Sequence, residues 1–237
     1  MKINIIDIIK IGSKISRINK NTLVISALCV ASILLWNTIL IYPLKLLVVL
    51  MHETSHAITA IATGGHVERI AVNIIQGGVT YTKGGNSLVI FSAGYLGSSL
   101  IGALILWAST RKPWKEYLAE AFGLLIIIEA IFWVRDAFTL FFVVAMGIFC
   151  IFLGIKIKGI FERLFMQLVG TVCCLYAVYD IFSDILSLRI LSGQGKNDAQ
   201  MLAQLTHIPA FIWGTIWIAI AAGIFLCVMK NISKTEE

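Results

Sequence analysis

Residues 47–65, LVVLMHETSHAITAIATGG, decide the fold of this chain. Two histidines and a glutamate interrupt a largely apolar run that extends from about residue 44 to 63. About 20 apolar residues in a helix cross the hydrocarbon core of a bilayer, which is about 30 Å thick. The run therefore predicts a membrane-spanning helix, and Gly64-Gly65 marks its end.

The composition of the whole chain agrees with a membrane protein. Of its 237 residues, 59% are hydrophobic and only 14% are charged, with a mean hydropathy of +0.91. Soluble domains carry about 25% charged residues, so this chain lacks the charge to coat a surface that faces water. We expect an integral, multi-pass membrane protein in contact with the lipid bilayer, folded as a single domain over residues 1–237.

On both sides of the motif helix, further long apolar runs predict an all-α bundle of about seven transmembrane helices. A basic segment precedes the first of them, and a polar linker precedes the last. The first run is long enough to be a retained helix or signal anchor, so it is not read as a cleaved peptide. The predicted helices are about 22–42, 44–63, 87–108, 118–134, 137–155, 164–188 and 210–229, the basic segment is 1–21, and the linker is 189–209.

The segment after the motif helix, residues 66–86, has a different pattern. Glycine pairs bound it and divide it, and between them apolar and polar residues partly alternate. Alternation bounded by glycines predicts a small β-hairpin that turns near Gln76-Gly77-Gly78. The alternative is an irregular polar loop.

The net charge of +6 comes from basic residues that gather at the ends of apolar runs. Membrane topology explains this excess better than nucleic-acid binding, so no nucleic-acid partner is expected. A cytoplasmic N-terminus, in a bacterial cell membrane, would place the motif and the hairpin toward the cytoplasmic side. The cations of residues 111–115 and 156–163 would then lie outside, so the positive-inside rule gives only a mild preference.

The motif His52-Glu53-Thr54-Ser55-His56 carries the chemistry. On a helix the two histidines are four residues apart and share a face, where they can bind one zinc ion. Zinc lowers the pKa of a bound water toward 7, and Glu53 can then take its proton. The motif therefore predicts a Zn2+-dependent endopeptidase. The alternative is a polar cluster that hydrogen-bonds neighbouring helices, but three ionisable groups within five residues of a spanning helix usually mark function.

A catalytic zinc takes three protein ligands and leaves one position for water. Depth in the bilayer favours Asp180 as the third ligand, because Asp180 and His56 lie at similar distances from the ends of their predicted helices. Asp184 is one turn further along the same face and is the alternative. The remaining candidates are Glu129, Asp136, Asp198, His66 and His207, with Asp136 and Asp198 expected near the boundary or in loops.

Small residues on the helix predicted over 87–108 form a stripe at Gly94, Gly97, Ser98 and Gly102. Such a stripe predicts close packing against another helix. Gly94 and Gly97 could also leave room for a substrate beside the zinc.

The run MHETSHA at 51–57, followed by TGG at 63–65, resembles the site-2 protease family of intramembrane zinc metallopeptidases, and is closest to a small branch without a PDZ domain. The similarity continues in shorter pieces. These are GGVT at 77–80, GGN at 84–86, SAGYLGS at 92–98, YDIFSD at 179–184, NDA at 197–199 and WGTIW at 213–217.

This resemblance implies zinc held by His52, His56 and an aspartate of a later helix, with Glu53 as general base. It implies substrates that are membrane-spanning segments or peptides near the membrane. In such a family the hairpin can align a substrate by adding a strand, so residues 67–83 become the candidate substrate contact. The resulting substrate-binding candidates are Gly77, Gly78, Val79, Thr80 and Gly94.

The chain departs from the better-known site-2 proteases at two places. It has Tyr-Asp-Ile around Asp180 where those proteins carry Leu-Asp-Gly, and AGYLG at 93–97 where they carry Gly-Pro-x-x-Asn. Two other functions therefore stay open: a non-proteolytic membrane scaffold that retains the zinc site, and an ion or metal transporter that uses the His and Asp residues as a path. The sequence does not define an oligomeric state.

Overall fold

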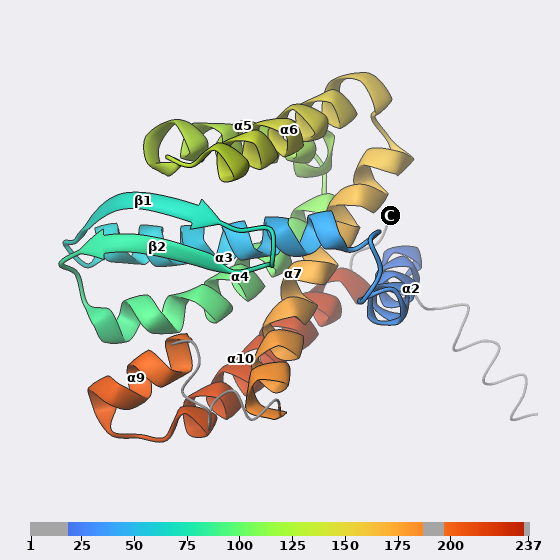
Figure 1. The fold of residues 1–237 in the computed structure, drawn as a ribbon. Coiled ribbons are helices and arrows are strands. Elements are labelled where there is room, and N and C mark those ends of the chain that lie inside the picture. Colours follow the sequence, from blue (N-terminus) through green and yellow to red (C-terminus); the bar gives the residue numbers. More distant parts are fainter. Residues whose placement is uncertain (1–18, 187–196, 235–237) are drawn as a thin grey trace, which may run out of the picture.

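The computed structural model describes residues 19–186 and 197–234, except for the side chains of residues 183–186. It is a helical bundle with one small antiparallel sheet (Figure 1). The helices are α2 (Lys20–Leu34), α3 (Tyr42–Ala62), α4 (Ser87–Ser109), α5 (Leu118–Trp133), α6 (Ala137–Phe152), α7 (Ile160–Leu186), α9 (Asp198–Thr206) and α10 (Ala210–Ser233), and the strands are β1 (His66–Val72) and β2 (Gly78–Lys83).

Within the described residues, five helical stretches are long and apolar enough to cross a membrane. They contain α3, α4, α6, α7 and α10. The predicted count of seven is not confirmed, because α2 and α5 have only 15 and 16 residues. The run predicted as one helix over 22–42 is broken where α2 ends and a turn leads to Pro43, which lies in the first turn of α3.

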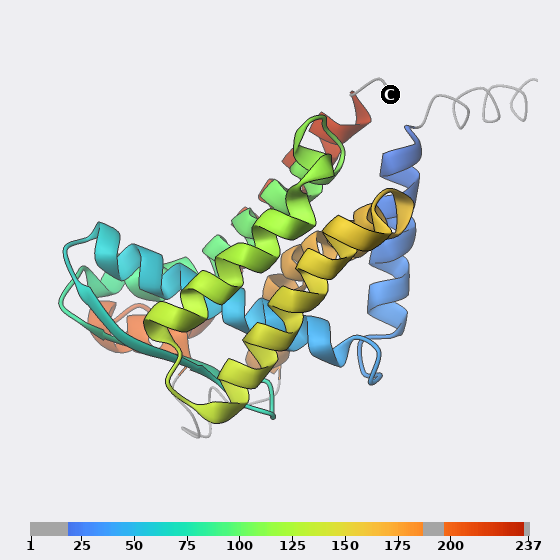
Figure 2. The same cartoon turned by 90° about the horizontal axis from the view of Figure 1, so that it is seen from above.

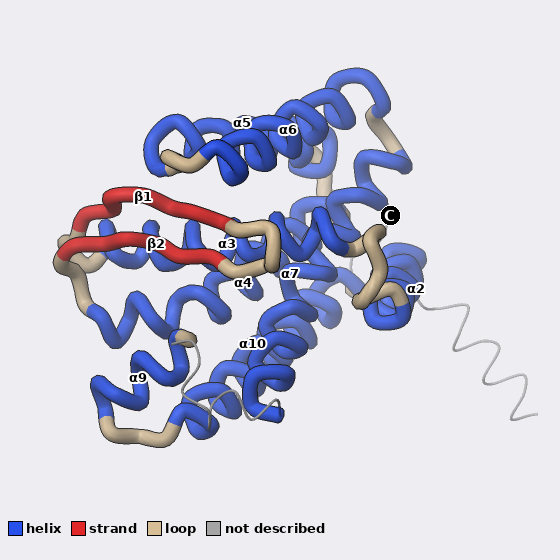
Figure 3. The backbone as a smooth tube through the Cα atoms, in the orientation of Figure 1, coloured by secondary structure: helices blue, strands red, loops and turns tan. Residues whose placement is uncertain are grey.

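The predicted β-hairpin is confirmed. Strands β1 and β2 pair from His66 opposite Lys83 to Val72 opposite Gly78. Asn73 shapes the turn, since its side-chain oxygen accepts hydrogen bonds from the backbone N–H groups of Ile75 and Gly77 at 3.1 and 2.9 Å. The sheet lies along α3 (Figures 1 and 3), which brings a strand edge next to the motif helix.

Helices α4 and α7 pack closely, as the stripe of small residues predicts. A Cβ atom built on Gly102 would lie 2.7 Å from the Gly170 carbonyl oxygen, and one built on Gly170 would lie 2.8 Å from the Gly102 carbonyl oxygen. The two backbones can therefore meet only because neither residue has a side chain. This contact fixes the wall of the bundle against which the motif helix rests.

Helices α5 and α6 pack chiefly on each other and form a pair beside the hairpin (Figure 1). The loop between them is held at β1, where Val134 makes a parallel bridge with Ile70. The hydroxyl of Thr139 lies 2.8 Å from the backbone nitrogen of Val72 and 3.0 Å from its carbonyl oxygen. These contacts satisfy backbone groups on the outer edge of β1.

The polar linker predicted over 189–209 contains a helix. Residues 187–196 lie outside the description, but Asn197 begins α9 with a capping box, in which Asn197 and Gln200 each bond the other's backbone nitrogen. Because this box satisfies two free N–H groups, it sets the first residue of the helix at Asp198. The chain then turns at His207 into α10.

Candidate metal centre

The two histidines of the motif lie on successive turns of α3 and face the same side. Their rings are 4.7 Å apart, centre to centre, and nearly perpendicular. The surrounding residues of α3 are largely buried, and His56 is itself only 6% exposed. Helical geometry thus holds both imidazoles toward one point inside the protein.

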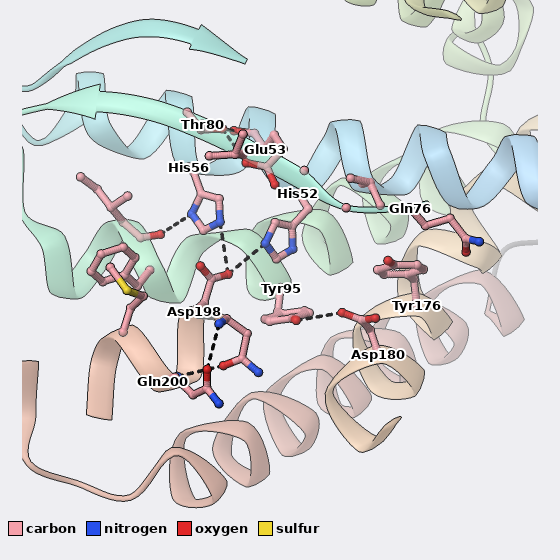
Figure 4. Close-up of a pocket in the computed structure, with 18 of the residues that line it drawn as sticks. His52, Glu53, His56, Gln76, Thr80, Tyr95, Tyr176, Asp180, Asp198 and Gln200 are labelled. Carbon is pink, nitrogen blue, oxygen red and sulfur yellow. Dashed lines mark hydrogen bonds and ion pairs between the residues drawn. The ribbon is translucent and has the colours of Figure 1, made fainter. Parts of the chain in front are cut away.

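The carboxylate of Asp198 meets these two rings from the start of α9 (Figure 4). Its Oδ2 atom lies 2.9 Å from His52 Nε2 and 3.2 Å from His56 Nε2. Burial alone would raise the pKa of Asp198, but the neighbouring imidazoles, with His56 first, hold it below its ordinary value. Among the described residues, His52, His56 and Asp198 form the one cluster of His, Cys, Asp or Glu side chains that could hold a metal ion, with all three ligand atoms within 4.8 Å of one another.

A contact behind His56 fixes the direction of its ring. Its Nδ1 atom lies 2.7 Å from the carbonyl oxygen of Ile90 on α4. A carbonyl only accepts, so this contact places a ring hydrogen on Nδ1 and leaves Nε2, on the side of Asp198, as the atom that could bind a metal ion. Ligand histidines in proteins commonly have such a partner.

The donor set and its spacing fit a zinc ion. Zinc bonds of about 2.0–2.1 Å in tetrahedral geometry separate neighbouring ligand atoms by about 3.3 Å. The separations of Asp198 Oδ2 from the two Nε2 atoms, 2.9 and 3.2 Å, need to open by only a few tenths of an ångström. Two imidazoles and one carboxylate are also a ligand set that zinc accepts.

Gly94 leaves the space in which these ligands meet. A Cβ atom at this position would lie 2.6 Å from His56 Nε2 and still closer to His52 Nε2. Real Cβ atoms do not approach other atoms so closely, so α4 can pack this close to the histidines only because residue 94 is glycine. Gly94 therefore belongs to the wall of the candidate centre.

Glu53 lies beside the centre and touches strand β2. The hydroxyl of Thr80 is 2.7 Å from Glu53 Oε2 and 2.9 Å from the Glu53 carbonyl oxygen, and it can donate its one hydrogen to either. The other carboxylate oxygen faces Gly78, where a Cβ atom would overlap it. Glu53 is 5% exposed. The strand thus orients a buried carboxylate next to the two histidines.

Asp180 lies near the centre but is not part of the three-residue group. Its Oδ2 atom accepts a hydrogen bond of 2.8 Å from the Tyr95 hydroxyl (Figure 4). The Tyr95 ring packs edge-on against His52, with 4.6 Å between ring centres. Asp180 is therefore connected to His52 indirectly, through the side chain of Tyr95. The side chain of Asp184 lies outside the described residues.

The other candidates have separate partners. Glu129 on α5 is buried, and its Oε1 atom lies 2.5 Å from the hydroxyl of Thr54 in the motif. Asp136 accepts a hydrogen bond from the backbone nitrogen of Thr139 and caps α6. His66 begins β1, and His207 ends α9 in the left-handed conformation.

The side chains of His52, Glu53, His56, Asp180 and Asp198 line one cavity of about 650 Å³. The hairpin contributes one wall, from Gln76 to Thr80 together with Thr82, and α3 contributes another. In the part of the chain that the structure describes, β2 pairs with β1 alone. The second edge of β2 is therefore not paired with a strand, and residues of β2 line the cavity. The remaining walls are Ile90, Phe91, Tyr95, Tyr176, Asp180, Asn197, Asp198, Gln200 and Met201.

A membrane helix bundle with a buried His-Glu-x-x-His cluster beside a strand edge has the form of a membrane-embedded metalloprotease. A sequence model of the family described as Peptidase M50B-like matches residues 25–228, and the chain belongs to that family. This is the site-2 protease family, so the resemblance seen in the sequence is confirmed. No curated protein and no solved structure matches the chain.

Proposed function

We propose that this protein is an intramembrane zinc endopeptidase whose ion is held by His52, His56 and Asp198. The observation that carries the proposal is the convergence of two Nε2 atoms and one carboxylate oxygen on a space kept open by Gly94. Three protein ligands leave one coordination position for water, as a catalytic zinc requires.

Asp198 replaces Asp180 in this proposal. The prediction of Asp180 assumed that a spanning helix supplies the third ligand, but Asp198 is the first residue of α9, a short helix of 9 residues that begins at the centre. We propose that Asp180 positions Tyr95 instead, because its carboxylate accepts the phenol hydrogen and the phenol ring supports His52.

When bound, zinc would polarise a peptide carbonyl and make a water molecule acidic enough to lose a proton near neutral pH. Glu53 would accept that proton, since its carboxylate lies beside the histidines and is held by Thr80. The oxygen of the water adds to the carbonyl carbon, the C–N bond breaks, and Glu53 returns the proton to the leaving amine. Burial of Glu53 keeps other water from competing for the carboxylate.

The substrate would bind as an extended strand along the second edge of β2. Backbone groups of Gly77, Gly78, Val79 and Thr80 would pair with it, as in other cases of strand addition. A transmembrane helix must unwind to pair in this way, and its backbone hydrogen bonds would then be satisfied by β2 instead of being lost in lipid. Membrane proteins or membrane-bound peptides are therefore the proposed substrate class.

The test is cleavage of a transmembrane peptide library by the purified protein in detergent or bilayers. Glu53→Gln removes the base and keeps the shape, so we expect cleavage to fall by at least about a hundredfold, as for loss of a general base. Metal content should stay the same, because Glu53 is not a ligand. Cleavage by Glu53→Gln at the rate of the wild type would exclude the mechanism.

The two other functions predict different results in the same material. A zinc-retaining scaffold would bind metal and cleave nothing in the wild type. A transporter would carry metal ions or protons across proteoliposomes, and Glu53→Gln would change that flux.

A further inference from the structure

The crossing helices of the bundle share two ends, which lie on opposite sides in Figure 2. The hairpin end contains β1, β2 and α9. The basic end contains residues 109–118, residues 156–163 and the last turn of α10. Contacts join these three segments: Lys158 Nζ lies 5.9 Å from the centre of the Tyr117 ring, and Arg111 donates a 2.6 Å hydrogen bond to Asn231.

Helix α2 starts at the basic end. Its Ile25 is fully buried in one cluster with Leu106 and Ile232, which lie near the ends of α4 and α10. Beyond the other end of α2, the ring of Trp36 is 4.6 Å from that of Tyr179, far along α7 toward the hairpin end. The chain therefore runs from the basic end toward the hairpin end as it passes through α2.

Helix α3 completes the crossing that α2 begins. At 1.5 Å per residue, the 15 residues of α2 span about 22 Å, which is less than the bilayer core of about 30 Å. After the turn, α3 continues and ends at Ala62, beside the hairpin. From Lys20 to Ala62 the chain thus changes sides once, whereas the two apolar runs over 22–42 and 44–63 predicted two crossings.

This change alters the distribution of charge between the two ends. Among the described residues, nine Lys and Arg residues lie at the basic end and three at the hairpin end, while Lys45 is buried against the ring of Trp36. The nine are Lys20, Arg111, Lys112, Lys115, Lys156, Lys158, Arg163, Lys230 and Lys234, and the three are Arg69, Lys83 and Arg135.

Loops rich in Lys and Arg stay in the cytoplasm when a membrane protein inserts. We infer that the basic end faces the cytoplasm and that the candidate metal centre opens toward the opposite side of the membrane. This is the reverse of the orientation expected from the sequence. There, one crossing too many put the cations of 111–115 and 156–163 on the side away from the N-terminus.

The orientation defines the substrate class more closely, a step that rests on the proposed function. Gly94 is the eighth residue of α4, so the centre lies about 10 Å from the hairpin end of that helix. Substrates would be membrane-anchored polypeptides whose cleaved bond lies in the leaflet away from the cytoplasm. Their chains would reach β2 from that side.

Labelling of single cysteines tests the orientation. Lys83→Cys marks the hairpin end and Lys112→Cys the basic end, and both lysine side chains are about three-quarters exposed. The full chain would be expressed in bacterial cells with Cys29 and Cys227 replaced by Ser, since the other three cysteines are buried. A membrane-impermeant maleimide is then added before or after the membrane is opened with detergent.

We expect Lys83→Cys to react in intact cells and Lys112→Cys to react only after the membrane is opened. The reverse pattern would overturn the inference, and so would reaction of both cysteines in intact cells. Reaction of both after detergent is the control for reactivity. The readout needs no cleavage, so loss of activity in Glu53→Gln together with the reverse labelling would keep the proposed function and reject the orientation.

Discussion

At the scale of single residues, Gly94 controls how closely α4 approaches the two histidines. Its missing side chain leaves the volume in which His52, His56 and Asp198 meet. Any larger residue would push the rings apart or fill the position of the ion. Metal binding should therefore depend on the residue at position 94 as well as on the three ligands.

Gly94→Ala should abolish zinc binding and cleavage, because the added methyl group would overlap both Nε2 atoms. Metal content of the purified variant, measured by elemental analysis, gives the answer directly. Gly223→Ala on α10 is the matched control, since a Cβ atom there meets nothing within 4 Å. Normal zinc content in Gly94→Ala would mean that the ion lies elsewhere.

The two aspartates can be separated by the same measurement. Asp198→Ala should lower zinc affinity by at least about tenfold, because one of three protein ligands is lost. Asp180→Asn should still bind zinc, since Asp180 contacts Tyr95 and not the centre. If instead Asp180→Asn loses zinc and Asp198→Ala keeps it, the ligand set proposed here is wrong.

The sequence predicts His52, Glu53 and His56 because their geometry depends only on the local pitch of one helix. The third ligand depends on how distant segments pack, and no local spacing encodes that. Asp198 did carry a signal: Asn197 and Gln200 are three residues apart, the spacing of a capping box. That pattern predicts a helix that starts at Asp198, inside what the composition suggested was a linker.

At the scale of elements, α9 acts as the support that presents Asp198 to α3. Its capping box holds the first turn in place, so the carboxylate has little freedom to leave the two imidazoles. A short helix can serve this purpose because it needs to be ordered only at its first residue.

Asn197→Ala should weaken zinc binding although it removes no ligand. Loss of a helix cap costs roughly 0.5–2 kcal/mol, which corresponds to about a two- to thirtyfold loss of affinity if α9 is ordered mainly in the bound state. A competition titration with a zinc chelator would measure it. Asn197→Ser, which keeps a capping oxygen, should restore most of the affinity, and equal affinities for all three proteins would contradict this role of α9.

The hairpin shows which elements can be predicted from the sequence. Its glycines and its alternating residues are local signals, and both strands form where these signals place them. The break between α2 and α3 was not predicted because residues 35–41 are mostly apolar, with Asn37 and Thr38 as their two polar residues. In a lipid environment, hydropathy alone does not distinguish a continuous helix from two helices joined by a turn.

At the scale of the whole molecule, the candidate centre joins elements that are far apart in the sequence. Helices α3 and α9 supply the ligands, α4 supplies the wall, and β2 supplies the strand edge. A bound ion would therefore connect α9 to the rest of the bundle, so metal binding and folding should be linked.

Removal of zinc should lower the thermal stability of the protein in detergent. A ligand at a hundred times its Kd stabilises the folded state by about 2.7 kcal/mol, and for a chain of this size that corresponds to roughly 5–11 °C in Tm. Chelation should produce this shift in the wild type. The same treatment should leave Tm unchanged in a His52→Ala/His56→Ala variant. If neither chelator nor added zinc changes the Tm of the wild type, metal binding and folding are not linked.

The paired helices α5 and α6 have a consequence for biogenesis. The surface that docks on the hairpin and on α3 carries Glu129 and Thr139, whose partners Thr54 and Val72 belong to segments made earlier. Until docking occurs, these polar groups meet acyl chains, and lipid offers them no hydrogen bonds. An undocked pair would therefore be an assembly intermediate in which Glu129, buried in the folded protein, is exposed to lipid. A cell can recognise such an exposed polar group and degrade the unassembled membrane protein.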